Sequence, residues 1–140
     1  MTPRDQAIGP ASSRDVVLVG DGEDMVRGVA RVILERSGYE VLQARDGVEA
    51  IEVFEAVGDR VSIVLLDLTM PRMSGRRAFA ELRARRPGLP IILSSGYVEN
   101  DVVTELLAAG LADFLPKPYV PAELIGQVRA VLAEHAESEG

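Results

Sequence analysis

Five short apolar runs alternate with five segments of helical periodicity, and this alternation limits the possible folds more than any other feature of the chain. The runs have strand length and many β-branched residues. They are VVLV at 16–19, YEVLQA at 39–44, VSIVLL at 61–66, PIILS at 90–94 and ADFL at 112–115. Strict alternation predicts a parallel sheet covered by helices on both faces, joined by right-handed crossovers. We therefore predict a single doubly wound, five-stranded α/β domain.

The segments between the runs each place their apolar side chains on one helical face. Their expected starts are Asp24 as an N-cap, Asp46 with Gly47, Gly75, Asn100, and Pro121 at a first helical position. Val120, before Pro121, has no capping side chain, which costs about 1 kcal/mol. Residues 1–14 and 134–140 are small and polar without periodicity, and we expect flexible tails there. The folded domain should then cover 15–133.

Composition removes several classes of function. The chain has no cysteine, and its only histidine, His135, lies in the polar stretch AEHAESEG, which argues against disulfides, histidine triads and His- or Cys-based metal sites. A net charge of −7 argues against direct nucleic-acid binding. No apolar run approaches the roughly 18 residues that cross a bilayer, and the first residues lack a signal-peptide core. We expect a cytoplasmic protein without membrane insertion.

Polar residues follow the strands, at the sheet edge where doubly wound folds bind ligands. They are Asp21, Glu23 and Asp24 after the first run, Asp67 after the third, Ser94 and Ser95 after the fourth, and Lys117 after the fifth. Lys117 is the only lysine among 15 basic residues, and its compact ammonium suits a carboxylate or phosphoryl group. Oxygen ligands suit Mg²⁺. The set predicts phosphoryl transfer to a carboxylate, with an acyl phosphate on Asp67 as product.

These residues together resemble the receiver domain of two-component response regulators. The resemblance runs from about Asp15 to Ala133 and rests on LLDLTMPRMSG at 65–75, SSGY at 94–97 and FLPKP at 114–118. It implies a flavodoxin-like (β-α)5 fold with strand order 2-1-3-4-5. SGY followed by KP also resembles receivers attached to hybrid sensor kinases.

The resemblance implies a signalling domain more than an enzyme, although it would assist its own phosphorylation and slow dephosphorylation. Asp67 would accept the phosphoryl group from a histidine kinase or a phosphotransfer protein, and Lys117 and Ser95 would bind that group. Ser95 and Phe114 match the switch positions. The surface of the fourth helix, fifth strand and fifth helix would contact an output partner or a second copy.

The metal site departs from the family pattern. The resemblance implies Mg²⁺ ligands at Asp21, Asp67 and the backbone carbonyl of Thr69. Receivers usually carry two adjacent acids after the first strand, and here Gly22 takes the place of the second. Glu23 would help only if the turn swings it inward. We therefore expect weak Mg²⁺ binding. The main alternative is a pseudo-receiver, an interaction module that is not phosphorylated because Gly22 replaces a metal-binding acid.

Two enzyme classes fit the sequence less well. A nucleotide-binding GxGxxG turn beginning at Gly20 would need glycine at position 25, where Met25 stands. A phosphatase of the haloacid dehalogenase type needs a second aspartate two residues after the nucleophile, and the residue there is Thr69.

Overall fold

The computed structural model describes residues 14–96 and 100–139, so Tyr97 of the SSGY segment and most of the N-terminal tail lie outside the described residues. Five parallel strands form one sheet in the order β2-β1-β3-β4-β5, which confirms the predicted topology. The strands are β1 (Val16–Gly20), β2 (Glu40–Ala44), β3 (Ile63–Asp67), β4 (Ile91–Ser95) and β5 (Asp113–Pro116). Every strand starts and ends within two residues of its predicted apolar run.

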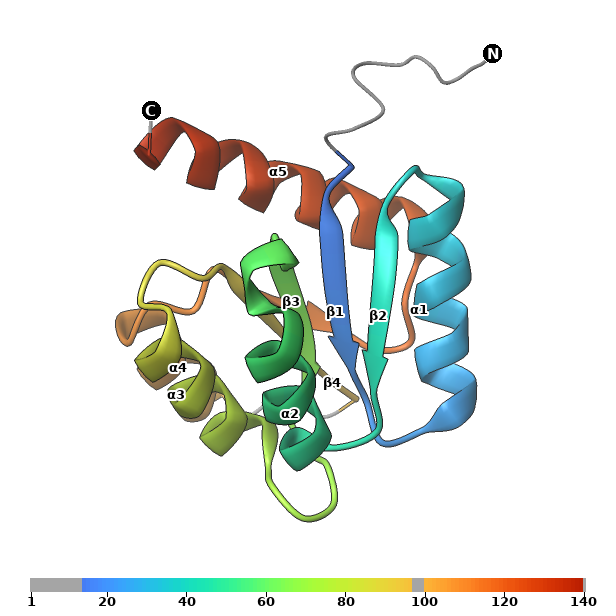
Figure 1. Ribbon diagram of the computed structural model, residues 1–140. Coiled ribbons are helices and arrows are strands. Elements are labelled where there is room, and N and C mark those ends of the chain that lie inside the picture. The colour runs from blue at the N-terminus through green and yellow to red at the C-terminus, as the bar shows by residue number, and fades with distance from the viewer. Residues whose placement is uncertain (1–13, 97–99, 140) are drawn as a thin grey trace.

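Helices follow the strands and lie on both sides of the sheet (Figure 1). They are α1 (Asp24–Arg36), α2 (Gly47–Val57), α3 (Gly75–Arg85), α4 (Asn100–Ala108) and α5 (Pro121–Glu139), with a short 3-10 helix at Gly58–Arg60. Helix α5 continues through residues 134–139, which the sequence assigned to a polar tail. Three glutamates and one alanine in that stretch favour helix without any apolar periodicity.

The start of α1 differs from the expectation by one residue. Glu23, and not Asp24, is the N-cap, and its side chain makes no capping hydrogen bond. Asp24 pairs instead with Arg27, with 2.6 Å between Oδ1 and Nη2. The acid at 24 therefore tethers the first helical turn through a side-chain contact.

The core has two layers because alternate strand residues face opposite sides of the sheet. One layer packs under α2, α3 and α4 and includes Leu18, Val64, Leu66, Ile91 and Leu93. The other packs under α1 and α5 and includes Val17, Val19, Ile63, Leu65 and Ile92. This double burial explains why the central runs are continuously apolar. Within the described residues, no helix has the length and apolar character needed to span a membrane.

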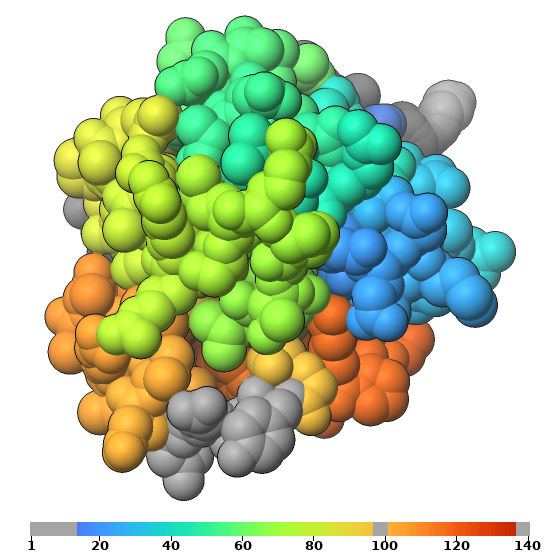
Figure 2. All heavy atoms as spheres, turned by 90° about the horizontal axis from the view of Figure 1, so that it is seen from below, coloured from blue at the N-terminus to red at the C-terminus, as the bar shows by residue number. Residues whose placement is uncertain are grey.

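Side-chain caps fix where two of the helices begin. Asp46 accepts a hydrogen bond from the backbone N–H of Glu49 at 2.8 Å, and Ser74 accepts one from Arg77 at 3.2 Å. The loops before these helices therefore stop at defined points on the carboxyl edge of the sheet. Figure 2 looks onto this edge, where the segments after β1 (blue), β3 (lime green) and β5 (orange) meet.

Candidate functional site

Two carboxylates and one ammonium from three strand ends meet at the carboxyl edge. Asp21 and Asp67 are 1% and 6% exposed. Nζ of Lys117 lies 2.8 Å from Oδ2 of Asp21 and 3.3 Å from Oδ2 of Asp67. The structure thus brings together three of the five charged residues that the sequence places at the strand ends, whereas Asp24 pairs with Arg27 and is 84% exposed.

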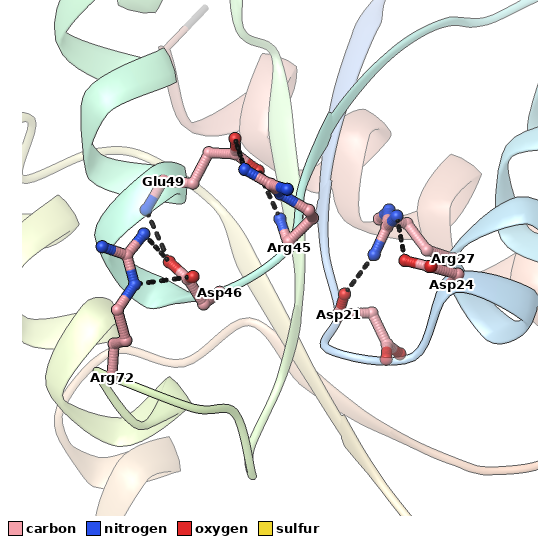
Figure 3. A network of polar contacts seen from close by, with 7 residues as sticks. All are labelled: Asp21, Asp24, Arg27, Arg45, Asp46, Glu49 and Arg72. Atoms are coloured by element: carbon pink, nitrogen blue, oxygen red, sulfur yellow. Dashed lines mark hydrogen bonds and ion pairs between the residues drawn. The ribbon is translucent and has the colours of Figure 1, made fainter.

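Backbone and arginine contacts hold the carboxylates in place. The N–H of Glu23 donates to Oδ1 of Asp21 at 2.9 Å, and the N–H of Thr69 donates to Oδ1 of Asp67 at 3.4 Å. Arg27, whose side chain is only 12% exposed, donates through Nη1 to the carbonyl of Asp21 at 2.8 Å (Figure 3). Sequence reasoning missed Arg27, which fixes the β1–α1 turn from inside α1.

The electrostatics of this group favour a cation between the acids. Burial raises the pKa of Asp67, the negative charge of Asp21 raises it further, and Lys117 only partly opposes both. Burial by itself would lower the pKa of Lys117, but its hydrogen bond to Asp21 and the charge of Asp67 raise it overall. The lysine therefore stays charged and partly neutralises two acids that repel each other.

The two serines at the end of β4 have different surroundings. Ser94 is fully buried, and its Oγ lies 2.8 Å from the hydroxyl of Tyr119. Ser95 lines the cleft that also contains Asp67 and Lys117, and its carbonyl accepts the Lys117 N–H at 3.0 Å. Burial raises the pKa of Tyr119 to about 12, so this phenol stays protonated. Of the two serines, Ser95 is the one that lines the cleft.

The cleft around these groups has a volume of about 940 Å³. The apolar part of its lining comes from α1 and from Pro118 and Tyr119 in the segment after β5. On α1, Met25 is 84% exposed and Val29 is 49% exposed. An acidic centre therefore opens directly onto exposed apolar surface.

The oxygen ligands that could hold a metal are fewer than in the family pattern. Among the described residues, no cluster of three or more acidic or histidine side chains could hold a metal ion. Glu23, whose side chain is 71% exposed, lies 3.7 Å from Nζ of Lys117. Asp21 and Asp67 both lie beside Lys117, and their carboxylate oxygens are ligands of the kind that Mg²⁺ accepts together with water. The residues present fit Mg²⁺ with two carboxylates.

The predicted switch residue Phe114 is half-buried on β5. It packs against the core layer beneath α4 that also contacts Val102. Its carbonyl accepts a hydrogen bond from Nε2 of Gln127 in α5 at 3.3 Å. Phe114 thus contacts elements on both faces of the sheet. Further along the chain, the peptide bond between Lys117 and Pro118 is cis.

A family model for the response regulator receiver domain matches residues 16–129. The chain belongs to the response regulator receiver family. This receiver domain is 38% identical over 128 residues to the sensor kinase CckA of Brucella abortus and 39% identical over 119 residues to the response regulator MprA of Mycobacterium ulcerans. These matches cover 91% and 83% of the chain, but 13% and 49% of the two relatives. The chain spans about half the length of the regulator and far less of the kinase.

Solved receiver structures share the fold. The CheY-like receiver domain protein from Methanospirillum hungatei JF-1 superposes with a TM-score of 0.84 at 28% identity, covering 91% of this chain and all of that one. A chain of the CheX–CheY–BeF3–Mg²⁺ complex from Borrelia burgdorferi gives 0.83 at 25% identity, covering 89% and 94%. The receiver domain is therefore a signalling domain of two-component systems, a family that in general binds Mg²⁺ at this acidic pocket and interacts with histidine kinases or phosphotransfer proteins.

Proposed function

We propose that this receiver domain is a phosphoacceptor in which Asp67 takes a phosphoryl group from a phosphohistidine. The observation that carries the proposal is the position of Asp67, a buried carboxylate 3.3 Å from the only lysine of the chain and in one cleft with Ser95. A carboxylate oxygen attacks phosphorus while the bond from phosphorus to the histidine nitrogen breaks, and that nitrogen recovers a proton.

The residues around Asp67 supply what this transfer needs. The Lys117 ammonium neutralises charge on the phosphoryl oxygens, and the Ser95 hydroxyl donates a hydrogen bond to one of them. Mg²⁺, held by Asp21, Asp67 and the Thr69 carbonyl, would add charge neutralisation at the same oxygens. The same groups would later support slow hydrolysis of the acyl phosphate, so the domain stores a signal and resets itself.

The cleft also indicates how the donor docks. A partner that carries phosphohistidine to Asp67 must cover the mouth of the cleft, where Met25 and Val29 are exposed. Apolar contact at that rim would bury surface that otherwise faces water. Histidine kinases and phosphotransfer proteins are the donors we propose, in keeping with the family. A cytoplasmic location, where these donors act, belongs to the same proposal.

Phosphorylation would reach a second surface through Ser95, Lys117 and Phe114. New charge-assisted contacts at the phosphoryl group would bias the positions of the loops after β4 and β5. The surface of α4, β5 and α5 would then present the change to an output partner or a second copy. Lys117→Ala should still accept phosphate, yet lose the phosphorylation-induced amide shifts around Phe114 and Val102.

The second candidate function is that of a pseudo-receiver, and Gly22 is the observation that favours it. It would keep the fold and the docking surface without the acyl phosphate. The close contact of Lys117 with Asp21 and Asp67 supports the phosphoacceptor instead.

Labelling separates the two functions. The protein is incubated with phosphoramidate or acetyl phosphate over a range of Mg²⁺ concentrations, and the intact mass is measured. We expect one added phosphoryl group in the native protein and in Asp113→Asn, an acid changed at the opposite end of β5, and none in Asp67→Asn. Labelling that persists in Asp67→Asn would reject the assignment, and a native protein that stays unlabelled at all Mg²⁺ concentrations would establish the pseudo-receiver.

A further inference from the structure

An ion pair at the start of α2 holds the loop between β3 and α3. Arg72 in this loop contacts Asp46 through two bonds, with Nε 2.9 Å from Oδ2 and Nη2 3.1 Å from Oδ1 (Figure 3). The Asp46 side chain is 10% exposed, and that of Arg72 is 56% exposed. The hydrogen bond from Arg72 holds the pKa of Asp46 below its usual range. This two-point contact fixes the orientation of the loop as well as its distance from α2.

The backbone of Arg72 adopts a conformation that needs such support. Its φ is 65°, in the left-handed region that side chains other than glycine rarely adopt. Strain of this kind persists where surrounding contacts fix the geometry, and it gathers at functional loops. Asp46 is the contact that the structure provides.

The same loop packs closely against the turn after β1. A Cβ atom added at Gly22 would stand 3.0 Å from Cδ of Pro71, the residue before Arg72. On the other side, a Cβ atom at Gly47 would stand 2.5 Å from the carbonyl oxygen of Met73. The loop thus lies between two glycines: a side chain at position 47 would clash with the loop backbone, and one at position 22 would fit only if Pro71 moved by a few tenths of an ångström.

We propose that the Asp46–Arg72 ion pair is a positioning device that holds the β3–α3 loop against Gly22 and thereby couples residue 22 to the loop that contains Thr69. This deepens the proposed phosphoacceptor function and rests on it, because the loop follows Asp67 directly. Two opposite effects follow. With glycine at 22, the ion pair keeps the Thr69 carbonyl in place for a metal. With an acid at position 22, the ion pair holds Pro71 in the path of the new side chain and so opposes its approach to the metal.

The first test needs neither metal nor phosphate. In the native, metal-free protein, nuclear Overhauser contacts between the Hα atoms of Gly22 and the Hδ atoms of Pro71 report the closed loop. Arg72→Asn breaks the pair with a residue that tolerates the left-handed region, and Asp46→Ser breaks it from the other side while keeping a capping side chain. Both variants should lose at least about half of the contact intensity.

Arg60→Asn is the matched control for these two variants. The Arg60 side chain is 53% exposed and pairs with Glu40, at the opposite edge of the sheet, so the contact between Gly22 and Pro71 should not change. Unchanged intensity in both Arg72→Asn and Asp46→Ser would overturn the proposal, since the loop would then stay closed without the ion pair.

The second test measures coupling through Mg²⁺ titration of four proteins: native, Gly22→Asp, Arg72→Asn and the double variant. Arg72→Asn should weaken Mg²⁺ binding when position 22 is glycine. The increase in Mg²⁺ affinity that Gly22→Asp brings should, however, be at least about threefold larger in the Arg72→Asn background than in the native one, as expected for coupled residues. Independent effects on the dissociation constant would overturn the coupling. A protein that is never labelled on Asp67 would refute the proposed function and leave the contact measurement intact, so the two failures are distinguishable.

Discussion

The hydroxyl of Ser94 lies 2.8 Å from the hydroxyl of Tyr119, so the first of two adjacent serines ties β4 to the segment after β5. Ser95, the second serine, lines the cleft. Ser95→Ala should slow phosphorylation by small donors by about tenfold, the value of one hydrogen bond to a charged group. Ser94→Ala should leave this rate unchanged. Time courses of intact mass with phosphoramidate compare the two variants directly.

Stability should show the reverse pattern. Ser94→Ala and Tyr119→Phe should each lower the free energy of unfolding by about 1 kcal/mol, and the double variant should lose little more, because both remove the same bond. Urea unfolding measures all three. Rate loss in Ser94→Ala without rate loss in Ser95→Ala would mean that the assignment of the serines is reversed.

Asp67→Asn should stabilise the fold at neutral pH. Burial and the charge of Asp21 raise the pKa of Asp67 in the folded state above its unfolded value of about 3.9. The protonated acid therefore stabilises the fold fully below about pH 3.9, and this stabilisation is lost as the pH rises through the folded pKa. Asparagine stays neutral throughout. The variant should therefore unfold at higher urea concentration than the native protein at pH 7, with a difference that shrinks toward pH 4.

A native protein as stable as Asp67→Asn at pH 7 would show that the acid carries no such cost. Asp113→Asn serves as the control in the same titration. A buried acid that lowers the stability of the fold when it ionises is typical of a functional site, which fits the role proposed for Asp67.

Removing the lysine should make the fold depend on metal. Lys117→Ala leaves Asp21 and Asp67 without their buried counter-ion, which should cost on the order of 3 kcal/mol. Mg²⁺ should restore more stability to this variant than it adds to the native protein, because a bound cation stabilises the folded state it requires. Thermal unfolding with and without Mg²⁺ measures both, and Lys117→Arg, which keeps the charge, is the control. An equal Mg²⁺ effect in Lys117→Ala and the native protein would argue that the metal does not bind between these acids.

An acid at position 22 should strengthen Mg²⁺ binding, with faster phosphorylation at low metal. A unit charge about 4 Å from the cation is worth on the order of 4 kcal/mol at an effective dielectric of about 20, although relaxation and water recover part of it. The tight approach of Pro71 removes a further part. Gly22→Ala carries the same Cβ without the acid and isolates that steric cost. Equal Mg²⁺ affinities for Gly22→Asp and Gly22→Ala would show that position 22 does not face the metal.

A better cap should stabilise α5. The carbonyl of Val120 already accepts the Leu124 N–H at 3.0 Å, but the valine side chain, 48% exposed, cannot accept a hydrogen bond from the first turn. Val120→Ser should raise the free energy of unfolding by about 1 kcal/mol in urea. Val120→Ala removes the same apolar surface without a cap and should bring no gain. A gain shared equally by both variants would exclude capping as its cause.

The sheet was predictable because its signals are local and strong. Runs such as VSIVLL strongly favour a strand that is buried on both faces. The rule that ligands bind at the carboxyl ends of parallel strands then predicts that Asp21, Asp67 and Lys117 lie together, as they do. Helix starts depended on weaker signals. The shift from Asp24 to Glu23 arose because Asp24 pairs with Arg27, which the residue type alone does not indicate.

The missed contacts involve long side chains from distant segments. Arg72 reaches Asp46 across 26 positions, and Tyr119 reaches Ser94 across 25, and no periodicity encodes either. The Asp-Gly pair at 46–47 marked a helix start but gave no sign of its second role. For Arg27, the spacing of three from Asp24 was a usable signal, although it does not reveal the bond to the Asp21 carbonyl.

The solitary lysine gives this domain a built-in reporter. Lys117 carries the one ε-ammonium group of the whole chain, with a side chain 11% exposed between Asp21 and Asp67. Feeding isotope-labelled lysine to the expression culture therefore yields one side-chain nitrogen signal, free of overlap, from the centre of the cleft. Its chemical shift would follow metal arrival, phosphoryl transfer and hydrolysis in real time, without a dye, a tag or any substitution.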